Sequence, residues 1–389
     1  MKKIIIVSSN MKVGGVQKSL CNLLWELDKR EDLEVTLLLF SPKGDYMGDI
    51  PPSVKCISTD SLFRYMGTSQ GEMTGIDRLK RGFLAGVCRV FGRASAMRII
   101  LASQKRLSES YDCAIAFLHN EGKKAFLGGA QDFVLKKINA KKRVAFLHCD
   151  YVKCGADHTH NNKMIAEFDT IAACSDGCRA VFEKALPHLA HKCVTVRNCN
   201  SIERIRSLAD QDTVEYASDS LNLICVARLS AAKGIDRAID AAAYALSQGI
   251  SLKLHIVGGG NMADELMRKV KDQGLEDKVI FYGEQANPYR FMKNADLFLL
   301  SSHHEAAPMV IDEAYILGIP TLTVRTTSSD EMVTARECGW VCENDGELLN
   351  KMLLDVLRSP YILYNEKEKL KNRLVSNDLA IAQFLSAIN

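Results

Sequence analysis

A run of polar and small residues at 301–314 carries the densest set of chemically useful side chains in the sequence. Glu305 lies in its first part, and Glu313 follows a proline, Pro308. Proline at the first position of a helix loses no hydrogen bond, so we expect a helix to begin there. The free N–H groups over 307–310 would then attract an anion. Two carboxylates flanking such a helix end could accept hydrogen bonds from hydroxyl pairs, with phosphate between them.

Two more segments combine positive charge or glycine with the end of an apolar run. Arg228 and Lys233 follow the run at 221–227, and three glycines at 258–260 follow the run at 252–257. Arg binds phosphate through two parallel hydrogen bonds and Lys adds a point charge, so this pair could hold a diphosphate. Consecutive glycines let a backbone approach a ligand closely. A solvated turn and a flexible strand-to-helix connection are the alternative interpretations.

The first half of the chain offers glycines and histidines at similar places. Gly14 and Gly15 lie between the apolar run 3–7 and a helical pattern, where they could form an anion-binding loop or a plain tight turn. His119 and His148 each come at the end of an apolar run. An imidazole there could donate a hydrogen bond to a phosphate or to an acceptor hydroxyl. The alternative is a histidine that only satisfies nearby backbone.

Cysteines and histidines also gather in the middle of the chain, which raises the question of a metal site. The set is Cys149, Cys154, His158, His160, Cys174 and Cys178. Its C-x4-C and C-x3-C spacings match no common zinc motif. We therefore predict reduced structural thiols and no metal ligand. The 13 cysteines of the chain are odd in number and scattered, which favours a reducing, cytosolic compartment.

Residues 78–106 form a basic segment that contains no acid. Its eight cations are Arg78, Lys80, Arg81, Arg89, Arg93, Arg98, Lys105 and Arg106. Apolar residues between 83 and 91 fall near one helical stripe, so the segment is typical of a helix that lies on an anionic lipid surface. A basic helix that covers the domain core is the alternative, and the glycines of this segment weaken any helix.

These candidate residues need strands to bring them together, and twelve apolar runs could supply them. The runs are 3–7, 34–40, 112–118, 143–147, 169–174, 193–196, 221–227, 252–257, 278–281, 296–300, 319–324 and 339–342. They are continuously apolar, as expected for parallel strands covered on both faces. Their alternation with helical patterns in two blocks predicts an α/β fold of two Rossmann-like, doubly wound domains. Ligands of such sheets bind beyond the carboxyl ends of the strands.

The strand rhythm breaks in a polar stretch at 198–220. We therefore expect an N-terminal domain at 1–200 and a C-terminal domain at 201–373. A final helix at 374–389 either continues the second domain or crosses back to the first. The net charge of +3 hides +10 in residues 1–200 and −7 in residues 201–389, which predicts different partners for the two domains. No apolar run approaches the ~20 residues of a membrane span.

Together these residues resemble the retaining GT-B glycosyltransferases of the glycogen-synthase-like group, loosely over 1–200 and tightly over 221–345. The matching motifs, in order, are Ala227-Arg228-Leu229 with Lys233-Gly234, Val257-Gly258-Gly259-Gly260, Val279-Ile280-Phe281-Tyr282-Gly283, Asn287-Pro288-Tyr289, Ala295-Asp296, Glu305-x7-Glu313-Ala314 and Gly318-Ile319-Pro320. The stretch 305–310 is similar to enzymes that build bacterial capsule, exopolysaccharide or O-antigen. Gly often stands there in place of Ala306, which affects the expected sugar pocket.

The resemblance implies two domains facing across a cleft and a role for each matching residue. The implied donor-binding residues are Arg228, Lys233, Gly258, Gly283, Ala306, Ala307, Pro308, Met309, Val310 and Glu313. His119 and Glu305 would be catalytic, and Gly14, Gly15 and His148 would bind acceptor or phosphate. No metal or cofactor is implied, because Arg, Lys and a helix end can stabilise a leaving diphosphate.

The expected activity is that of a metal-independent, retaining hexosyltransferase. It would use a nucleotide sugar, UDP-linked, and a lipid-linked or polysaccharide acceptor. We expect a cytoplasmic protein, peripheral at the inner face of the plasma membrane through residues 78–106, with no nucleic-acid partner. A non-catalytic nucleotide-sugar-binding protein and an epimerase on the same fold are the alternatives.

Overall fold

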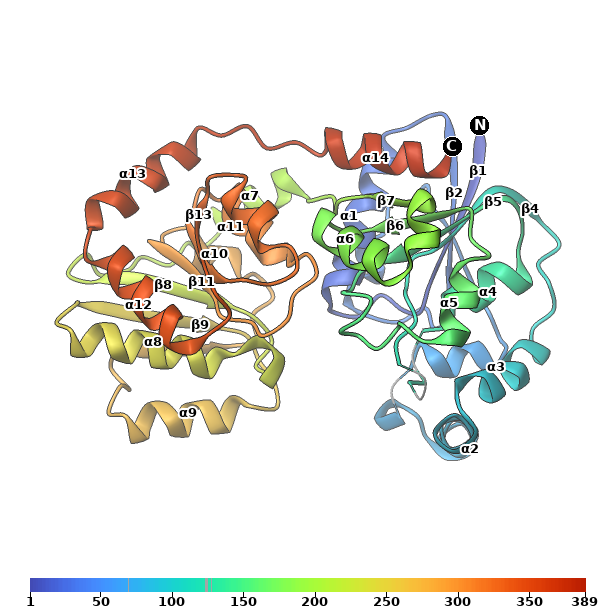
Figure 1. The fold of residues 1–389 in the computed structure, drawn as a ribbon, viewed down its shortest axis with the longest axis horizontal. Coiled ribbons are helices and arrows are strands. Elements are labelled where there is room, and N and C mark those ends of the chain that lie inside the picture. The colour runs from blue at the N-terminus through green and yellow to red at the C-terminus, as the bar shows by residue number, and fades with distance from the viewer. Residues whose placement is uncertain (69, 123–124, 127) are drawn as a thin grey trace. The chain divides into compact units, whose positions relative to one another are not determined.

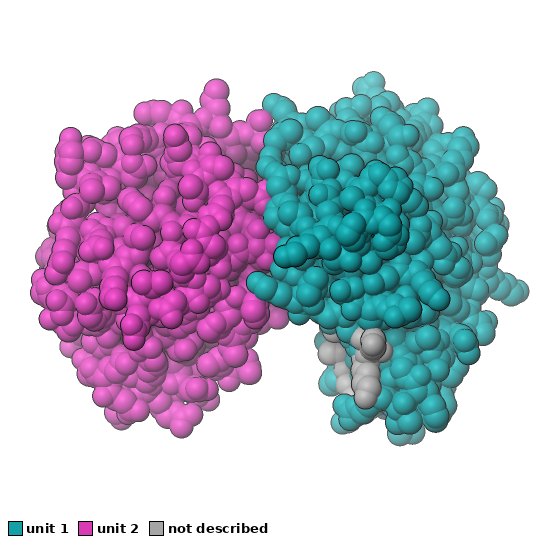
Figure 2. Space-filling view, in the orientation of Figure 1, with its two compact units in different colours: residues 1–199, 377–389 teal, residues 200–376 magenta. Residues whose placement is uncertain are grey.

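The chain forms two compact units (Figure 2). The structure, a computed structural model, describes residues 1–68, 70–122, 125–126 and 128–389. Unit 1 comprises residues 1–199 and 377–389, and unit 2 comprises residues 200–376. The boundaries predicted from the sequence follow residues 200 and 373. The chain therefore completes unit 2 and then contributes its last residues to unit 1.

Unit 1 is built on a seven-stranded parallel sheet with the order β3-β2-β1-β4-β5-β6-β7 (Figure 1). Its strands are β1 (Lys2–Ser8), β2 (Leu33–Leu39), β3 (Lys55–Ser58), β4 (Ser110–Ala116), β5 (Asn139–Leu147), β6 (Thr170–Ala173) and β7 (Cys193–Thr195). Ile4, Ile5 and Ile6 of β1 are all fully buried, so both faces of this central strand are covered. That is the burial a parallel sheet requires.

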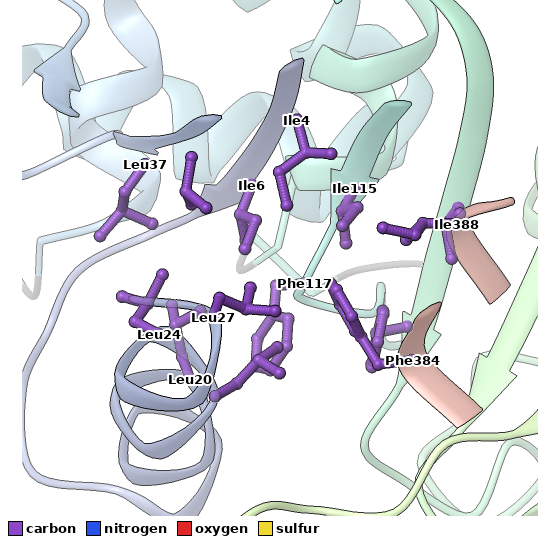
Figure 3. Close-up of a cluster of buried hydrophobic side chains, with 14 of the residues drawn as sticks. Ile4, Ile6, Leu20, Leu24, Leu27, Leu37, Ile115, Phe117, Phe384 and Ile388 are labelled. Atoms are coloured by element: carbon purple, nitrogen blue, oxygen red, sulfur yellow. The ribbon is translucent and has the colours of Figure 1, made fainter. Parts of the chain in front are cut away.

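Within the described residues of unit 1, seven α-helices accompany this sheet. They are α1 (Gly15–Asp28), α2 (Gly75–Phe91), α3 (Arg93–Ala102), α4 (Ala130–Lys137), α5 (Thr159–Ile165), α6 (Asp176–Ala185) and α14 (Asp378–Ile388). Leu20, Leu24 and Leu27 of α1 share one hydrophobic cluster with Phe384 and Ile388 of α14 (Figure 3). Residues from both ends of the chain therefore build one core.

Unit 2 is built on a six-stranded parallel sheet with the order β10-β9-β8-β11-β12-β13. Its strands are β8 (Leu221–Val226), β9 (Leu252–Val257), β10 (Val279–Gly283), β11 (Leu297–Leu300), β12 (Thr321–Val324) and β13 (Gly339–Cys342). Its helices are α7 (Ile202–Ala209), α8 (Ile235–Ser247), α9 (Ala263–Asp272), α10 (Tyr289–Met292), α11 (Met309–Ile316), α12 (Gly346–Leu357) and α13 (Pro360–Lys371). Residues of α8, α9 and α12 pack in one core cluster, and those of α7, α10 and α11 pack in a second.

The prediction of two doubly wound α/β domains is confirmed. All twelve expected strands are present, with ends that differ from the expected ones by at most four residues. Only β3 was missed, because its sequence Lys55-Cys56-Ile57-Ser58 is too short and too polar to read as an apolar run. β3 is an edge strand and remains largely exposed, so its side chains need not be apolar.

The basic segment 78–106 differs from the expected single interfacial helix. It forms two helices, α2 and α3, that are separated by Gly92 at φ 82°. Arg93, which the sequence analysis counted among the lipid-facing cations, is only 4% exposed and pairs with Asp132 at 2.9 Å. That prediction is wrong for Arg93, because a cation facing the core needs a buried partner rather than lipid.

The polar stretch 198–220 contains an element that the sequence analysis did not expect. Residues Ile202–Ala209 form α7, whose Ile202 and Ile205 are buried in the second core cluster of unit 2. Among the helices of the described residues, none combines the length and the apolar composition that a membrane crossing needs.

Candidate functional site

The candidate residues of unit 2 lie where neighbouring parallel strands end. Arg228 and Lys233 follow β8, Gly258 follows β9, Gly283 ends β10, and Glu305 follows β11. These four strands are consecutive neighbours in the sheet, so their carboxyl ends share one edge. Topology thus places the unit 2 candidates along one edge, although they span 86 residues of sequence, from 228 to 313.

The decisive contact in unit 2 is an ion pair between Lys233 and Glu305. Lys233 Nζ lies 2.6 Å from Glu305 Oε1, and the Glu305 side chain is only 9% exposed. A short, partly buried pair of this kind has a larger Coulomb attraction than an exposed pair, and it also loses more hydration. The structure therefore joins two residues from separate strand ends.

Glycines let the loops at this edge approach each other. Gly258 has φ +144°, and a Cβ there would lie 1.9 Å from the carbonyl oxygen of Ala227. Its N–H donates to Gly283 O at 2.8 Å, which ties the ends of β9 and β10 together. At Gly234, φ is +58° and a Cβ would meet Ser301 O at 2.4 Å. A side chain at Gly258 or Gly234 would force these loops apart.

Two residues that the sequence analysis missed hold the loop before Glu305. Arg237 Nη1 donates to Asn344 Oδ1 at 2.7 Å and to Ser301 O at 3.4 Å. Asn344 Nδ2 in turn donates to His303 O at 3.1 Å. Arg237 lies in the first turn of α8 and Asn344 follows β13, so no local motif joins them to this loop. Only the three-dimensional arrangement identifies them as positioning residues.

The helix expected at Pro308 is α11, and it begins one residue later. Pro308 has ψ 113° and precedes the first helical residue, Met309. Among the described residues, no side chain caps this end of α11. Glu313 lies within α11 and is only 2% exposed, whereas Arg228 is exposed. The structure therefore brings Lys233 to Glu305 but leaves Arg228 outside that contact.

In unit 1, His119 and His148 follow the neighbouring strands β4 and β5. Burial lowers the pKa of His119 to about 4. Burial and the nearby His119 lower the pKa of His148 to about 3. Both imidazoles are therefore neutral at pH 7. Nδ1 of His119 and Nε2 of His148 are buried without a hydrogen-bond partner in the part of the chain that the structure describes.

A buried polar network, also missed from the sequence, supports the loop that carries His119. Arg93 Nη2 donates to Asn120 Oδ1 at 2.9 Å and to Asp132 Oδ2 at 2.9 Å. Asn120 Oδ1 also accepts the N–H of Gly129 at 3.1 Å. Asn120, the residue next to His119, is thus held by hydrogen bonds from Arg93 and Gly129.

Gly14 and Gly15 occupy the start of α1, as a helix-entry loop requires. Gly14 is extended at the N-cap and Gly15 is the first helical residue, and no side chain caps this end. A Cβ at Gly14 would lie 2.6 Å from Gln17 Oε1, while a Cβ at Gly15 would meet nothing within 4 Å. The side chain of Gln17 is flexible and could move away, so close approach does not require a glycine at either position.

The thirteen cysteines are all free. Cys149 and Cys154 lie close together, with sulfur atoms 3.1 Å apart. An imidazole nitrogen of His119 lies within 4.8 Å of both sulfur atoms. The sequence spacing did not suggest this grouping, because His119 comes from a different strand end.

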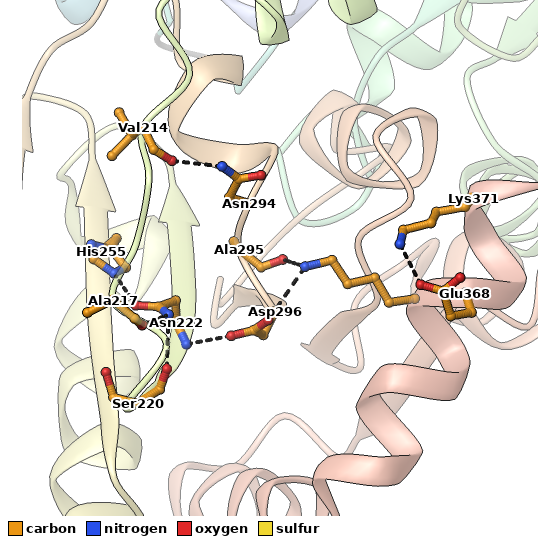
Figure 4. A network of polar contacts seen from close by, with 11 residues as sticks. Val214, Ala217, Ser220, Asn222, His255, Asn294, Ala295, Asp296, Glu368 and Lys371 are labelled. Carbon is orange, nitrogen blue, oxygen red and sulfur yellow. Dashed lines mark hydrogen bonds and ion pairs between the residues drawn. The ribbon is translucent and has the colours of Figure 1, made fainter.

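Not every buried histidine belongs to a candidate site. His255 in β9 contacts Asn222 Oδ1 through Nε2 at 3.1 Å and Tyr282 Oη through Nδ1 at 3.0 Å. Asn222 N also donates to Asp296 Oδ2 at 2.9 Å, which links β8 to the start of β11 (Figure 4). Both ring nitrogens of His255 are satisfied within the unit, so its role is structural.

Comparison with known protein families finds a match in the part of the chain that forms unit 2. Residues 210–377 match the model of the family described as glycosyl transferases group 1. The match covers nearly all of unit 2, which comprises residues 200–376. The glycosyltransferase resemblance that the motifs over 221–345 indicated is thereby confirmed.

Curated relatives align with part of the chain. The amylovoran biosynthesis glycosyltransferase AmsK of Erwinia amylovora is 30% identical over 143 residues, which are 34% of this chain and 35% of the relative. A Campylobacter jejuni protein is 30% identical over 194 residues, 48% of this chain and 50% of the relative. It is named N-acetylgalactosamine-N,N'-diacetylbacillosaminyl-diphospho-undecaprenol 4-alpha-N-acetylgalactosaminyltransferase. The matches thus span about half or less of these relatives.

Solved structures align with the whole chain. A variant of S. aureus TarM, in complex with fondaparinux, alpha-GlcNAc-glycerol and UDP, has a TM-score of 0.70 at 13% identity and covers 100% of both chains. Anabaena HepE in complex with UDP has a TM-score of 0.65 at 19% identity, also over 100% of both chains. At such low identity these similarities establish the GT-B fold alone.

Proposed function

We propose that this protein is a retaining, metal-independent glycosyltransferase that transfers a hexose from a UDP-linked sugar to a lipid-linked or polysaccharide acceptor. The observation that carries the proposal is the Lys233–Glu305 pair, at the strand ends of a glycosyl transferases group 1 unit. An epimerase would need acid and base groups beside the donor sugar, and the motifs supply none. The diphospho-undecaprenol in the name of the Campylobacter relative supports a lipid-linked acceptor.

In the proposed reaction, unit 2 stabilises the leaving diphosphate. Lys233, Arg228 and the uncapped start of α11 supply positive charge where the bond between sugar and phosphate breaks. Glu305 and the backbone of Ala306, Ala307, Pro308, Met309 and Val310 hold the sugar, and Glu313 binds the ribose hydroxyls. Gly258 and Gly283 admit the nucleotide. The acceptor oxygen attacks on the leaving-group face, and the diphosphate takes its proton, so the configuration is retained.

Unit 1 contributes the acceptor side of the proposed reaction. His119 is neutral at pH 7, so one of its ring nitrogens carries a proton and donates a hydrogen bond while the ring adds no positive charge. His148, equally neutral, lies near it and contacts the acceptor. Gly14 and Gly15 approach acceptor or phosphate at the open end of α1.

The experiment is a screen of the purified chain against nucleotide sugars, with EDTA present and absent. We expect hydrolysis and transfer with one UDP-linked hexose, undiminished by EDTA, and an α-configured product. Loss of activity in EDTA would refute metal independence. UDP binding without turnover of any donor would favour a non-catalytic binder.

We further propose that the protein is cytoplasmic and contacts the inner face of the plasma membrane through α2. The exposed apolar residues of α2 are Ile76 (66% exposed), Leu79 (74%), Phe83 (65%), Val90 (71%) and Phe91 (71%). Arg78, Lys80 and Arg89 on the same helix are also exposed. An exposed apolar stripe beside cations is typical of an interfacial helix.

This lipid contact is tested with vesicles that contain phosphatidylglycerol. We expect Leu79→Ser with Phe83→Ser to weaken sedimentation with vesicles at least about tenfold, because two apolar side chains lose their burial in lipid. Leu374→Ser in unit 2 is the control, since Leu374 is 99% exposed and lies outside α2. Unchanged vesicle binding of the double variant would rule out α2 as the contact.

A further inference from the structure

Three soft ligand groups meet at the ends of β4 and β5. The sulfur atoms of Cys149 and Cys154 are 3.1 Å apart, and a ring nitrogen of His119 lies within 4.8 Å of both. In a tetrahedral zinc site, with bonds of about 2.3 Å to sulfur and 2.0–2.1 Å to nitrogen, neighbouring ligand atoms are about 3.3–3.8 Å apart. Small side-chain rotations would therefore suffice to bring all three onto one ion.

Independent features show that this grouping is built into the fold. Cys149 is only 8% exposed, and Nδ1 of His119 is buried with no hydrogen-bond partner in the described part of the chain. Asp150 Oδ1 accepts the N–H of Lys153 at 2.9 Å, and Cys154 N donates to Asp150 O at 3.0 Å. These turn bonds fold the chain back so that Cys154 returns to Cys149.

A buried side chain also holds the loop that carries the two cysteines. Tyr151 is fully buried, and its hydroxyl donates to Asn162 Oδ1 at 2.8 Å. Cys154 is partly exposed, which leaves a path for an ion from solvent. The geometry therefore combines one buried ligand, Cys149, with two partly exposed ligands, His119 and Cys154.

The charge of the grouping suits a divalent cation. Two thiolates and one neutral imidazole carry −2, so a bound divalent ion would leave the buried site neutral. Binding would release the two thiol protons to solvent.

We propose that His119, Cys149 and Cys154 form a binding site for a soft divalent cation such as Zn²⁺, with water as the fourth ligand. A second part of the inference rests on the proposed function: the ion occupies the imidazole of His119 and so inhibits transfer. The metal here regulates the site and takes no part in the reaction, in keeping with a metal-independent transferase.

Cobalt substitution tests the site without reference to activity. Full-length chain, reduced with a phosphine and freed of metal, is titrated with Co²⁺. We expect thiolate-to-cobalt charge-transfer bands and tetrahedral d–d bands that saturate at one equivalent, and Zn²⁺ that displaces the cobalt. Cys154→Ser should weaken cobalt binding by about 10- to 100-fold. Removing a residue that only hydrogen-bonds to a metal ligand already costs that much affinity.

The matched control is Cys174→Ser, because Cys174 and Cys178 form another close pair, with sulfur atoms 3.9 Å apart and both residues buried. Cobalt bands that are absent from the wild-type chain, or that persist in Cys154→Ser and vanish in Cys174→Ser, would overturn the site. Circular dichroism verifies that each variant is folded.

The inhibitory part has its own readout. If the chain turns over a UDP-sugar, stoichiometric Zn²⁺ should lower the rate at least tenfold in the wild type and less than twofold in Cys154→Ser. Equal inhibition of both would overturn the regulatory role. A chain that binds cobalt at His119 yet turns over no donor would retain the site and refute the proposed function, so the two failures are distinguishable.

Discussion

At the scale of single residues, Lys233 and Glu305 concentrate the chemistry of unit 2. They are separated by 72 positions in sequence, yet their charged atoms lie 2.6 Å apart. The motifs alone placed each residue at a strand end but could not pair them, because pairing depends on the order of β8 and β11 in the sheet. Arg237, Asn344 and the grouping of His119 with two cysteines escaped the sequence analysis for the same reason.

Lys233→Ala should reduce kcat for sugar transfer by about 10²- to 10³-fold, as expected when one preorganised positive group is removed from a developing charge. Lys269→Ala is the matched control, because Lys269 forms a similar 2.7 Å pair with Asp240 and is 28% exposed against 30% for Lys233. Initial-rate kinetics with the identified donor measure both. Equal activity of the two variants would remove Lys233 from the proposed mechanism.

At the scale of elements, the break between α2 and α3 decides which cations meet solvent. The helical period and the positive charge of this segment are evident from its sequence, but the period does not say which residues face the core. Gly92, at φ 82°, ends α2 and lets α3 begin at Arg93, which points into unit 1. The buried Asp132 and Asn120 then complete the contact.

Arg93→Met should destabilise unit 1 by about 3–5 kcal/mol, because it leaves the Asp132 carboxylate buried and unpaired. Arg93→Met with Asp132→Leu should recover much of that loss. Arg89→Met, at an exposed position of α2, should change stability by less than about 0.5 kcal/mol. Urea denaturation followed through Trp25 of α1, in a Trp340→Phe background, reports unit 1; equal effects of the two single variants would contradict the assignment.

His255 makes unit 2 sensitive to acid. Burial lowers its pKa from 6.5 to about 4, so the unfolded chain binds a proton below pH 6.5 that the folded chain does not bind. Stability from this group is therefore complete above pH 6.5 and declines as the pH falls toward 4. Between pH 7.5 and 5 the loss should be about 2 kcal/mol.

The measurement compares wild type with His255→Gln by urea denaturation at pH 7.5 and 5, followed through Trp340 in a Trp25→Phe background. The variant should lose about 2 kcal/mol less than wild type over this interval. His160→Gln, at an exposed position of unit 1, is the control and should leave the fall unchanged. An identical fall in wild type and His255→Gln would contradict the role of His255.

At the scale of the whole molecule, strand and helix alternation was enough to predict two doubly wound sheets. The physical reason is that a parallel strand buried on both faces is apolar throughout, which marks it in any sequence. What could not be predicted was the outcome for the last helix. The pattern of α14 is compatible with either unit, and its contacts with β5 and the cluster around Phe384 assign it to unit 1.

Phe384→Ala should destabilise unit 1 by about 3–5 kcal/mol, since Phe384 is fully buried and packs against Phe146 with ring centroids 6.3 Å apart. Leu379→Ala on the same helix is the control, because Leu379 is 55% exposed. Fluorescence of Trp25 during urea denaturation should show the loss for Phe384→Ala alone. A loss of stability that only Trp340 reports would contradict the assignment of α14 to unit 1.

The return of residues 377–389 to unit 1 also bears on the order of events during synthesis. The ribosome makes residues 1–199, then the whole of unit 2, and only then α14. Until that point the nascent unit 1 exposes the surface that Phe384 and Ile388 later cover. Unit 2 is contiguous and can complete itself first, as domains generally do during translation. A chaperone that recognises apolar surface would therefore meet the N-terminal half for longer than the half made after it.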